Sequence, residues 1–212
     1  MKKIEMVIFD LDGTLWETTD VTYESANEIM NKYKINHEIT KETIIKTMGC
    51  NFQESAENYM PDIDAEYRIR LLREINDLNS QKLCRKGGKV YTNLEDVLIK
   101  LKKKYKLAIV SNCVENYIES FLESSNLELY FDDFIAASKM KISKSDAIKQ
   151  IIERNNINSA IYVGDTLKDY EASEEAGIKF IHARYGFGET LKSEYGINNI
   201  TELPEMIENL KY

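Results

Sequence analysis

The first apolar segment of the chain reads MVIFDLDGT, residues 6–14. Four apolar residues in succession are typical of a strand that is buried on both faces in the centre of a parallel sheet. Asp10 follows the expected strand end, and open α/β sheets bind ligands in the crevice beyond the carboxyl ends of their strands. If the backbone stays extended, Asp10 and Asp12 point to the same side, about 6 to 7 Å apart. This segment therefore predicts a central strand and two carboxylates at the ligand-binding edge.

Two carboxylates placed in this way can divide the work of a group transfer. Asp10 can attack as a nucleophile, as carboxylates do when they form aspartyl-phosphates, and Asp12 can move a proton as general acid and base. Gly13 allows backbone to approach a ligand closely, so its N–H and the adjacent Thr14 are candidate phosphate contacts. The alternative is a strand followed by an Asp-Gly turn whose acids lie in solvent.

Apolar segments alternate with helical patterns along most of the chain. Helical spacing appears, for example, in residues 94–101 and 147–152. The alternation predicts a Rossmann-like α/β core, a parallel sheet with helices on both faces. Strands are expected at Ile4–Phe9, Leu107–Val110, Phe134–Ala137, Ala160–Val163 and Lys179–His182.

Residues 20–85 interrupt this alternation, because they show helical patterns and no convincing strand. The patterns cover Tyr23–Tyr33, Thr43–Met48 and Ala65–Cys84. We expect an inserted all-helical domain, residues 17–86, in a core made of residues 1–16 and 87–212. Gly87-Gly88 supplies a turn signal at the second junction.

A second motif, GDTLKD at residues 164–169, follows another apolar strand. Asp165 falls at the carboxyl end of that strand, so a third carboxylate joins the crevice of Asp10 and Asp12. Converging acids repel one another unless a cation lies between them, and Mg²⁺ suits carboxylate, carbonyl and water oxygens best. Asp169 has two interpretations, since Thr166-x-x-Asp169 is a helix-capping pattern and a carboxylate here can also support the site.

Ser111-Asn112 follows the strand expected at Leu107–Val110. A hydroxyl at this strand end, with the backbone N–H after it, can hold a phosphate oxygen. A Ser-Asn pair after a strand is also typical of a plain turn or a helix cap.

Lys144 is a candidate for a phosphate clamp. Ser143 is expected to cap a helix whose first residue is Lys144. A cation at this end of a helix is unfavourable for the helix dipole, and a bound anion would offset it. A solvent-facing lysine is the alternative, and Lys139 and Lys141 compete for the role.

Composition excludes several classes of function. The 212 residues carry 28 Lys and Arg against 36 Asp and Glu, a net charge of −8, which disfavours nucleic-acid binding. No apolar run reaches the roughly 18 residues of a membrane span. Three scattered cysteines, Cys50, Cys84 and Cys113, predict a reducing cytoplasm without a disulfide or a zinc site. A monomer and a homodimer are both compatible with the sequence.

The order of these motifs resembles that of the haloacid dehalogenase superfamily of phosphatases, over most of residues 1–15 and 88–190. The helical insertion resembles the cap domain of the first type in that family. The sequence YGFG at residues 185–188 resembles its phosphoglycolate-phosphatase-like branch. The resemblance implies a phosphatase for a small phosphorylated metabolite, either phosphoglycolate or a sugar phosphate.

The resemblance also implies a role for each motif residue. Asp10 would form the aspartyl-phosphate, while Asp12 would protonate the leaving alcohol and then deprotonate the attacking water. Mg²⁺ would be held by the side chains of Asp10 and Asp165 and by the backbone carbonyl of Asp12. The residues that bind the phosphoryl group or support the site would be Ser111, Lys144 and Asp169.

Three positions depart from the family pattern. Ser145 follows Lys144, where the family often has proline, which puts the identity of the motif lysine in question. Trp16 stands where a smaller residue is usual, so it would pack under the cap or narrow the substrate pocket. The expected specificity loop, residues 48–52, lacks the lysine with which phosphonate-cleaving relatives form a Schiff base.

Other functions of the same fold are alternatives. Phosphosugar mutases of the superfamily favour Glu-Asp at the positions of Gly164-Asp165, and dehalogenases lack the acid that corresponds to Asp12. A non-catalytic binding module on the same fold stays compatible with the sequence, because fold does not determine function.

Overall fold

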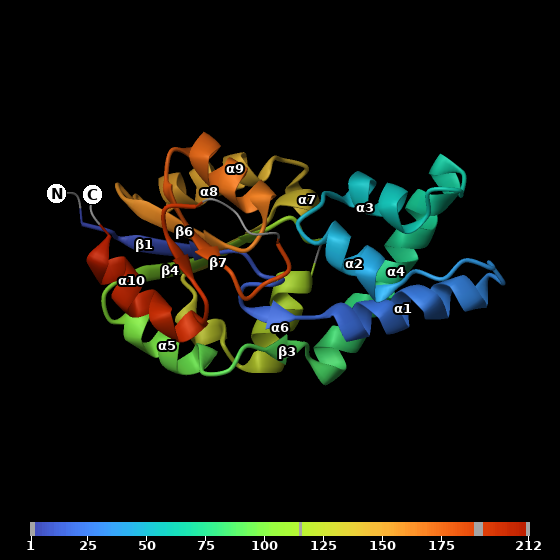
Figure 1. Ribbon diagram of the computed structural model, residues 1–212, viewed down its shortest axis with the longest axis horizontal. Helices are drawn as coiled ribbons and strands as arrows, with labels where there is room; N and C mark the ends of the chain where they lie inside the picture. Colours follow the sequence, from blue (N-terminus) through green and yellow to red (C-terminus); the bar gives the residue numbers. More distant parts are fainter. Residues whose placement is uncertain (1–2, 115, 189–192, 211–212) are drawn as a thin grey trace.

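The computed structural model of the chain describes residues 3–114, 116–188 and 193–210. These residues form a six-stranded parallel sheet with the order β5-β4-β1-β6-β7-β8 (Figure 1). Strand β1 lies between β4 and β6, so its carboxyl end is flanked by the ends of two other strands. The strands are β1 (Met6–Phe9), β4 (Lys106–Ser111), β5 (Asp133–Ala136), β6 (Ala160–Gly164), β7 (Lys179–Ala183) and β8 (Gly196–Ile197).

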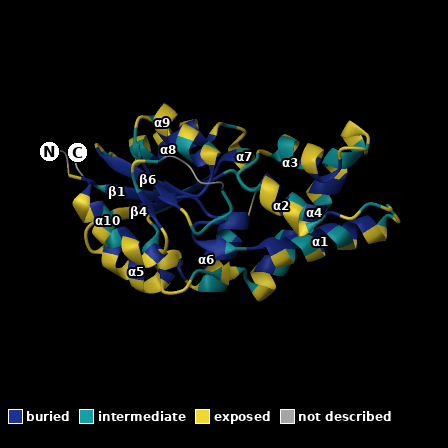
Figure 2. Cartoon of the chain, viewed as in Figure 1, coloured by how far each residue is buried: buried dark blue, intermediate teal, exposed yellow. Residues whose placement is uncertain are grey.

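Helices cover both faces of the sheet. Successive residues of β1 point to opposite faces, and each face buries its apolar side chains against helices. Val7 and Phe9 pack with helices α5, α6 and α10, whereas Met6 and Ile8 pack with α8 and α9. Figure 2 shows buried strands and helices whose outer faces are exposed. The helices of this part are α5 (Leu94–Lys102), α6 (Tyr117–Ser125), α7 (Ala137–Met140), α8 (Lys144–Arg154), α9 (Leu167–Ala176) and α10 (Leu203–Asn209), with the 3-10 turns η1 (Glu128–Tyr130) and η2 (Ile200–Glu202).

Four helices lie together at one end of the sheet (Figure 1). Most of their buried apolar residues form a cluster of their own, which runs from Ala26 to Ile75 in the sequence, whereas Leu83 of the last helix joins the cluster of the sheet. The chain enters and leaves this group through an antiparallel ribbon, in which Trp16 of β2 (Trp16–Glu17) faces Val90 of β3 (Lys89–Val90). The helices are α1 (Thr19–Lys32), α2 (Lys41–Thr47), α3 (Phe52–Tyr59) and α4 (Ala65–Lys86).

The predicted fold class, a parallel α/β core with an inserted helical segment, is confirmed. The five predicted strands all form, each within two residues of the expected bounds at either end. Three short strands, β2, β3 and β8, were not predicted, and neither was helix α3. Within the described residues 20–85, the structure shows helices and no strand.

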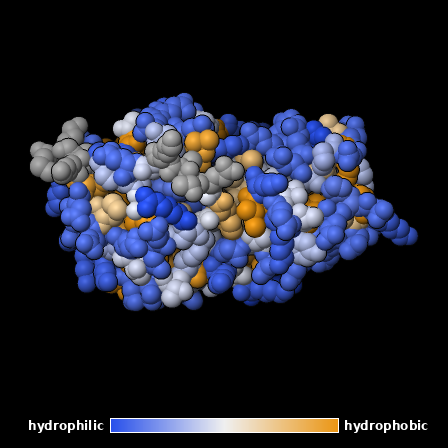
Figure 3. All heavy atoms as spheres, viewed as in Figure 1, coloured by the Kyte–Doolittle hydropathy of each residue, from blue (hydrophilic) through white to orange (hydrophobic). Residues whose placement is uncertain are grey.

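The surface in Figure 3 is mostly hydrophilic. Among the described residues, the large apolar side chains that are exposed lie on five different elements. They are Ile45, Ile99, Leu129, Met140 and Leu167. No helix in the described part of the chain is long and apolar enough to cross a membrane.

Candidate active site

Asp10 is the first residue after β1, and it lies at the carboxyl edge of the sheet as predicted. Its N–H donates to the Val163 carbonyl of β6 at 2.8 Å, which continues the strand pairing by one residue. The residue is 3% exposed. A carboxylate this deeply buried requires charged or hydrogen-bonding partners.

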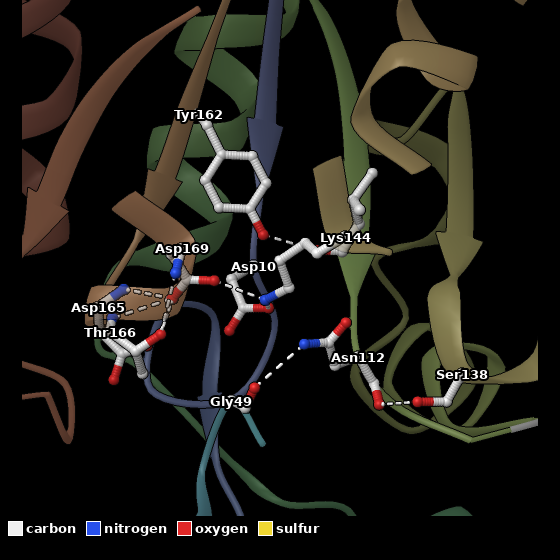
Figure 4. Close-up of polar contacts among 10 residues, drawn as sticks. Asp10, Gly49, Asn112, Ser138, Lys144, Tyr162, Asp165, Thr166 and Asp169 are labelled. Atoms are coloured by element: carbon white, nitrogen blue, oxygen red, sulfur yellow. Dashed lines mark hydrogen bonds and ion pairs between the residues drawn. The ribbon is translucent and has the colours of Figure 1, made fainter. Parts of the chain in front are cut away.

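Lys144 supplies that partner. Its ammonium donates to Asp10 Oδ1 at 2.8 Å and to Asp169 Oδ1 at 2.5 Å, and Figure 4 shows the nitrogen between the two carboxylates. Lys144 is the first residue of α8 and is 5% exposed, whereas the competing Lys139 and Lys141 are exposed. The structure therefore brings together Asp10, Asp169 and Lys144, and not the two competitors.

Asp169 makes both of the contacts that the sequence left as alternatives. Its Oδ2 accepts from the Thr166 N–H at 2.9 Å and the Thr166 hydroxyl at 2.7 Å, and its own N–H donates back to that hydroxyl. This is a capping box at the start of α9. Because one oxygen caps the helix, the other is fixed in the direction of Lys144.

Asp165 completes a cluster of buried acids. One carboxylate oxygen from each of Asp10, Asp165 and Asp169 lies within 4.8 Å of the other two. The N–H of Phe187 donates to Asp165 Oδ2 at 2.7 Å, while Asp165 Oδ1 is buried and has no hydrogen-bond partner among the described residues. An oxygen-rich cluster with an orphaned carboxylate oxygen fits a hard divalent cation such as Mg²⁺.

The backbone around this cluster is tightly constrained at Gly13. Its φ is +79°, and a Cβ at this position would lie 2.2 Å from Asp165 Oδ2. The Gly13 N–H donates to the Trp16 carbonyl at 2.9 Å. The predicted phosphate contact of this N–H therefore finds no support in the geometry, because the turn itself uses the donor. The glycine instead makes room for Asp165.

Thr14 also lies away from its predicted role. The residue is fully buried, and its hydroxyl has no partner among the described residues. Its carbonyl accepts a hydrogen bond from the Tyr185 hydroxyl at 2.9 Å, which ties the motif to the YGFG segment. Thr14 therefore holds the loop in place and does not line the cavity beside Asp10.

Asp12 occupies a different environment from the other acids. Its Oδ1 accepts hydrogen bonds from the Thr18 hydroxyl and the Tyr117 hydroxyl, both at 2.9 Å. Its carboxylate is not part of the three-acid cluster, so its predicted metal contact would involve only the backbone carbonyl. Tyr117 comes from α6, 105 positions away, and sequence reasoning missed both of these partners.

Burial dominates the proton affinities of the acids. It raises the pKa of Asp10 to about 7, with Asp169 adding to the rise and Lys144 opposing it. It raises the pKa of Asp12 to about 6, against the hydrogen bonds from Thr18 and Tyr117. Burial and the neighbouring carboxylates of Asp169 and Asp10 also hold the pKa of Asp165 well above its ordinary range.

Burial acts on the pKa of the Lys144 ammonium in the opposite sense. Burial lowers the pKa of Lys144, but the charges of Asp10 and Asp169 outweigh that effect and hold the pKa well above its ordinary value. The lysine is therefore a fixed positive charge at neutral pH. It offsets part of the repulsion among the acids, and a divalent cation would offset more.

A cavity of about 110 Å³ opens beside Asp10 and Asp12, between the sheet edge and helices α1–α4. Ser111, the last residue of β4, and Asn112, which follows it, form part of its wall. The side-chain amide of Asn112 donates to the Gly49 carbonyl at 3.1 Å, and the backbone carbonyl of Asn112 accepts from the Ser138 hydroxyl at 2.7 Å (Figure 4). Asn112 therefore links the cavity to the loop at residues 48–52.

Trp16 does not narrow the cavity. Its ring is fully buried and lies edge-to-face with Tyr117 and Phe121 of α6, with centroids 5.5 and 5.1 Å away. Of the two expectations for this residue, the structure shows packing, but against α6 of the α/β core and not beneath the inserted helices. The contact also positions Tyr117, whose hydroxyl reaches Asp12.

The family model described as haloacid dehalogenase-like hydrolase matches residues 7–183. The chain is similar to pyrophosphatase PpaX of Bacillus mycoides, at 23% identity over 98% of this chain and 99% of that protein. It is similar to phosphoglycolate phosphatase of Nitrosospira multiformis, at 27% identity over 98% of this chain and 95% of that protein. It also resembles the crystal structure of a predicted phosphatase from Clostridium acetobutylicum, with a TM-score of 0.81, 26% identity, and coverage of 99% of this chain and 100% of that one.

Proposed function

The chain belongs to the haloacid dehalogenase-like hydrolase family, and from that premise we propose that it is a Mg²⁺-dependent phosphatase for a small phosphomonoester. The observation that carries the proposal is the carboxylate of Asp10, which is bound by Lys144 and faces a cavity at the sheet edge. The names of two relatives assign them pyrophosphate and phosphoglycolate as substrates. Transfer of a phosphoryl group to water is the chemistry that both names share.

Asp10 acts as the nucleophile. One carboxylate oxygen attacks phosphorus, and the P–O bond to the leaving alcohol breaks, so the phosphoryl group is held as an aspartyl-phosphate. Lys144 favours the ionised form of Asp10, because its positive charge lowers the pKa that burial raises. Water then attacks the same phosphorus, and the bond to Asp10 breaks to release inorganic phosphate.

Asp12 moves the protons for these two steps. It gives its proton to the leaving alcohol oxygen and later takes one from the attacking water. Thr18 and Tyr117 hold Oδ1, so Oδ2 is the oxygen left for the reacting groups. A pKa of about 6 suits a group that must both give and take a proton near neutral pH.

The phosphoryl oxygens are bound from several sides. Ser111 supplies a hydroxyl at the end of β4, and Lys144 supplies positive charge. Gly13 donates within its own turn, whereas the N–H groups of Leu11 and Asp12, which follow Asp10 in the sequence, make no hydrogen bond among the described residues and can bind the phosphoryl oxygens. Bound Mg²⁺, held by Asp10, Asp165 and the Asp12 carbonyl, would neutralise charge on the phosphoryl group.

We propose further that residues 17–86 act as a cap domain over a core of residues 1–16 and 87–212. The loop at residues 48–52 and the first turn of α3 meet the core at three places. Gly49 accepts from Asn112 and lies against Thr166, while Lys168 forms an ion pair with Glu54 of α3. A closed cap excludes water from the first chemical step and opens for product release.

Phosphate release from a panel of esters tests the proposed function. The purified protein is assayed with Mg²⁺, with chelator, and as the Asp10→Asn variant, using sugar phosphates, phosphoglycolate, pyrophosphate and p-nitrophenyl phosphate. We expect metal-dependent turnover that Asp10→Asn abolishes and that Asp62→Asn, at an exposed position, keeps. A folded protein that releases no phosphate from any ester would overturn the proposal.

A further inference from the structure

The wall of the cavity opposite Asp10 is formed partly by one face of helix α4. Leu72, Asn76 and Asn79 recur at helical spacing and all line the cavity, together with Thr22 of α1. A substrate whose phosphorus lies at Asp10 would place its leaving alcohol in the part of the cavity that this wall lines. Its side chains are an aliphatic group, two amides and a hydroxyl, and none of these carries a charge.

Asn79 is a buried polar residue with one unused hydrogen-bonding end. It is 4% exposed and lies in the apolar stripe of α4 that contains Leu72, Ile75 and Leu83. Its Nδ2 donates to the Thr22 hydroxyl at 3.2 Å, whereas its Oδ1 is buried and has no partner among the described residues. A buried amide oxygen without a partner costs free energy, so a group that supplies a donor to it is favoured.

The identity of that group follows from the amide chemistry. If the two ends of the Asn79 amide are exchanged, Thr22 donates to the oxygen and the free end becomes an N–H donor. A hydroxyl group satisfies either arrangement, because it can both donate and accept. The unused end of Asn79 therefore indicates a ligand hydroxyl.

The charges around the cavity argue against an anionic leaving group. Among the described residues that line it, none is Lys, Arg or His. Lys144 contacts Asp10 beside the cavity, but it is already paired with two carboxylates. Asp10 and Asp12 both line the cavity and bear negative charge when ionised. A second phosphate or a carboxylate on the substrate would meet this wall without a cation to pair with it.

Resting on the proposed function, we propose that the preferred substrate is the monophosphate of a small, uncharged alcohol that bears a further hydroxyl, and that Asn79 binds this hydroxyl. Short polyol and small sugar monophosphates belong to this class. Phosphoglycolate and pyrophosphate, the substrates in the names of two relatives, do not belong to it. A cavity of 110 Å³ is small beside the roughly 300–1,000 Å³ of sites for drug-sized ligands, which favours short alcohols.

Matched pairs of esters test this proposal directly. 2-Hydroxyethyl phosphate differs from 2-phosphoglycolate, and glycerol 3-phosphate from 3-phosphoglycerate, by a hydroxymethyl group in place of a carboxylate. We expect kcat/KM to be at least about tenfold higher for the hydroxyl member of each pair, because the carboxylate meets no cation. A smaller or reversed ratio overturns the proposal. Ethyl phosphate, which lacks the hydroxyl, should be about threefold to tenfold poorer than 2-hydroxyethyl phosphate.

Variants of α4 test whether this helix causes the preference for a substrate that is uncharged and carries a hydroxyl. Asn79→Leu should bring the ratio of 2-hydroxyethyl to ethyl phosphate turnover close to one, whereas Asn58→Leu, on the exposed side of α3, should keep the wild-type ratio. An unchanged ratio in Asn79→Leu removes Asn79 from the proposal. If that variant does not fold, the half-buried Asn76 offers a second test. Asn76→Arg should narrow the discrimination against phosphoglycolate, and a discrimination that stays unchanged counts against a wall selective by charge.

One control separates this proposal from the proposed function. p-Nitrophenyl phosphate has a reactive leaving group, so its Asp10-dependent hydrolysis reports phosphatase chemistry with little demand on the cap. If it is hydrolysed and phosphoglycolate is preferred over 2-hydroxyethyl phosphate, the phosphatase assignment stands and the uncharged-alcohol proposal is wrong. If no ester is hydrolysed, the proposed function itself fails, and the substrate proposal fails with it.

Discussion

Lys144 is the residue on which the charge balance of the site depends. Its ammonium contacts both Asp10 and Asp169, and its removal leaves two buried carboxylates without a cation. The pKa of Asp10, already raised to about 7, would rise further, so the nucleophile would be protonated at neutral pH. We expect Lys144→Met to lower kcat/KM for phosphate release by about 10²- to 10³-fold.

The control for this prediction is Lys141→Met, because Lys141 is exposed three residues earlier. It should retain wild-type kinetics. If Lys144→Met stays within tenfold of the wild type while Lys141→Met does not, the exposed lysine is the phosphate clamp and the assignment is reversed.

Gly13 offers a residue-scale test of close packing. Gly13→Ala adds a Cβ that would lie 2.2 Å from Asp165 Oδ2, at a φ of +79°. Gly177→Ala is a matched control, because Gly177 has a φ of +74° but open space around its Cβ position. Both should lose about 1 kcal/mol of unfolding free energy from the left-handed backbone, as measured by urea denaturation. Only Gly13→Ala should also lose activity and Mg²⁺ affinity, and equal activities in the two variants would refute the steric argument.

The residues of the site that sequence reasoning identified are those whose motifs are contiguous. Asp10 and Asp12 follow one apolar strand and Asp165 follows another, so strand ends alone placed them at one edge. Tyr117 and Asn79 could not be found in this way. Each acts through a contact with a distant segment, Tyr117 with Asp12 and Asn79 with Thr22. Only the packing of α6 and of α4 creates those contacts.

Among the helices, α3 contributes both to the stability of the fold, through its N-terminal cap, and to the wall of the cavity. Asn51 caps it with hydrogen bonds from the N–H groups of Gln53 and Glu54, and Phe52 and Ser55 of the same helix line the cavity. We expect Asn51→Ala to lower the free energy of unfolding by about 1 kcal/mol, because the cap is lost. It should also raise KM, because fraying of the first turn displaces two cavity residues.

The N-terminal cap of α4 provides a matched control for the loss of the α3 cap. Asp64 accepts from the N–H groups of Glu66 and Tyr67 at the start of α4, away from the cavity. Asp64→Ala should show a similar loss in urea denaturation with an unchanged KM. If both variants change KM equally, the effect arises from general destabilisation and not from α3.

The elements that were predicted share a simple property, which is a strong apolar pattern. The five predicted strands are the longest of the sheet, and each has buried apolar residues. Strands β2, β3 and β8 have two residues each, too few to show any alternation. Helix α3, with the sequence FQESAENY, buries only Ala56 and Tyr59. Its capping box was the usable signal, and apolar periodicity alone overlooks it.

At the scale of the whole molecule, cation binding should stabilise the fold. Asp10, Asp165 and Asp169 lie within 4.8 Å of one another, so their repulsion opposes folding unless a cation is bound. Mg²⁺ at about one hundred times its Kd should add about 2.7 kcal/mol to the free energy of unfolding. For a chain of this size we expect a Tm increase of about 5 to 10 °C by calorimetry.

Chelator should reverse this increase, and sodium chloride of equal ionic strength should not reproduce it. Asp165→Asn should reduce the shift, because it removes a charge from the cluster. A shift of full size in Asp165→Asn would place the cation elsewhere.

The central place of β1 has a consequence for how the chain is made. Phe9 pairs with both Ile109 and Val163. The first strand therefore cannot pair with both neighbours until about 150 further residues have been synthesised, which takes roughly 8 to 30 s. Helices α1–α4 emerge in the meantime, and their cluster from Ala26 to Ile75 draws only on residues already made. We therefore expect the helical segment to become compact first during translation, and the nucleophile of the site to be assembled among the last parts of the sheet.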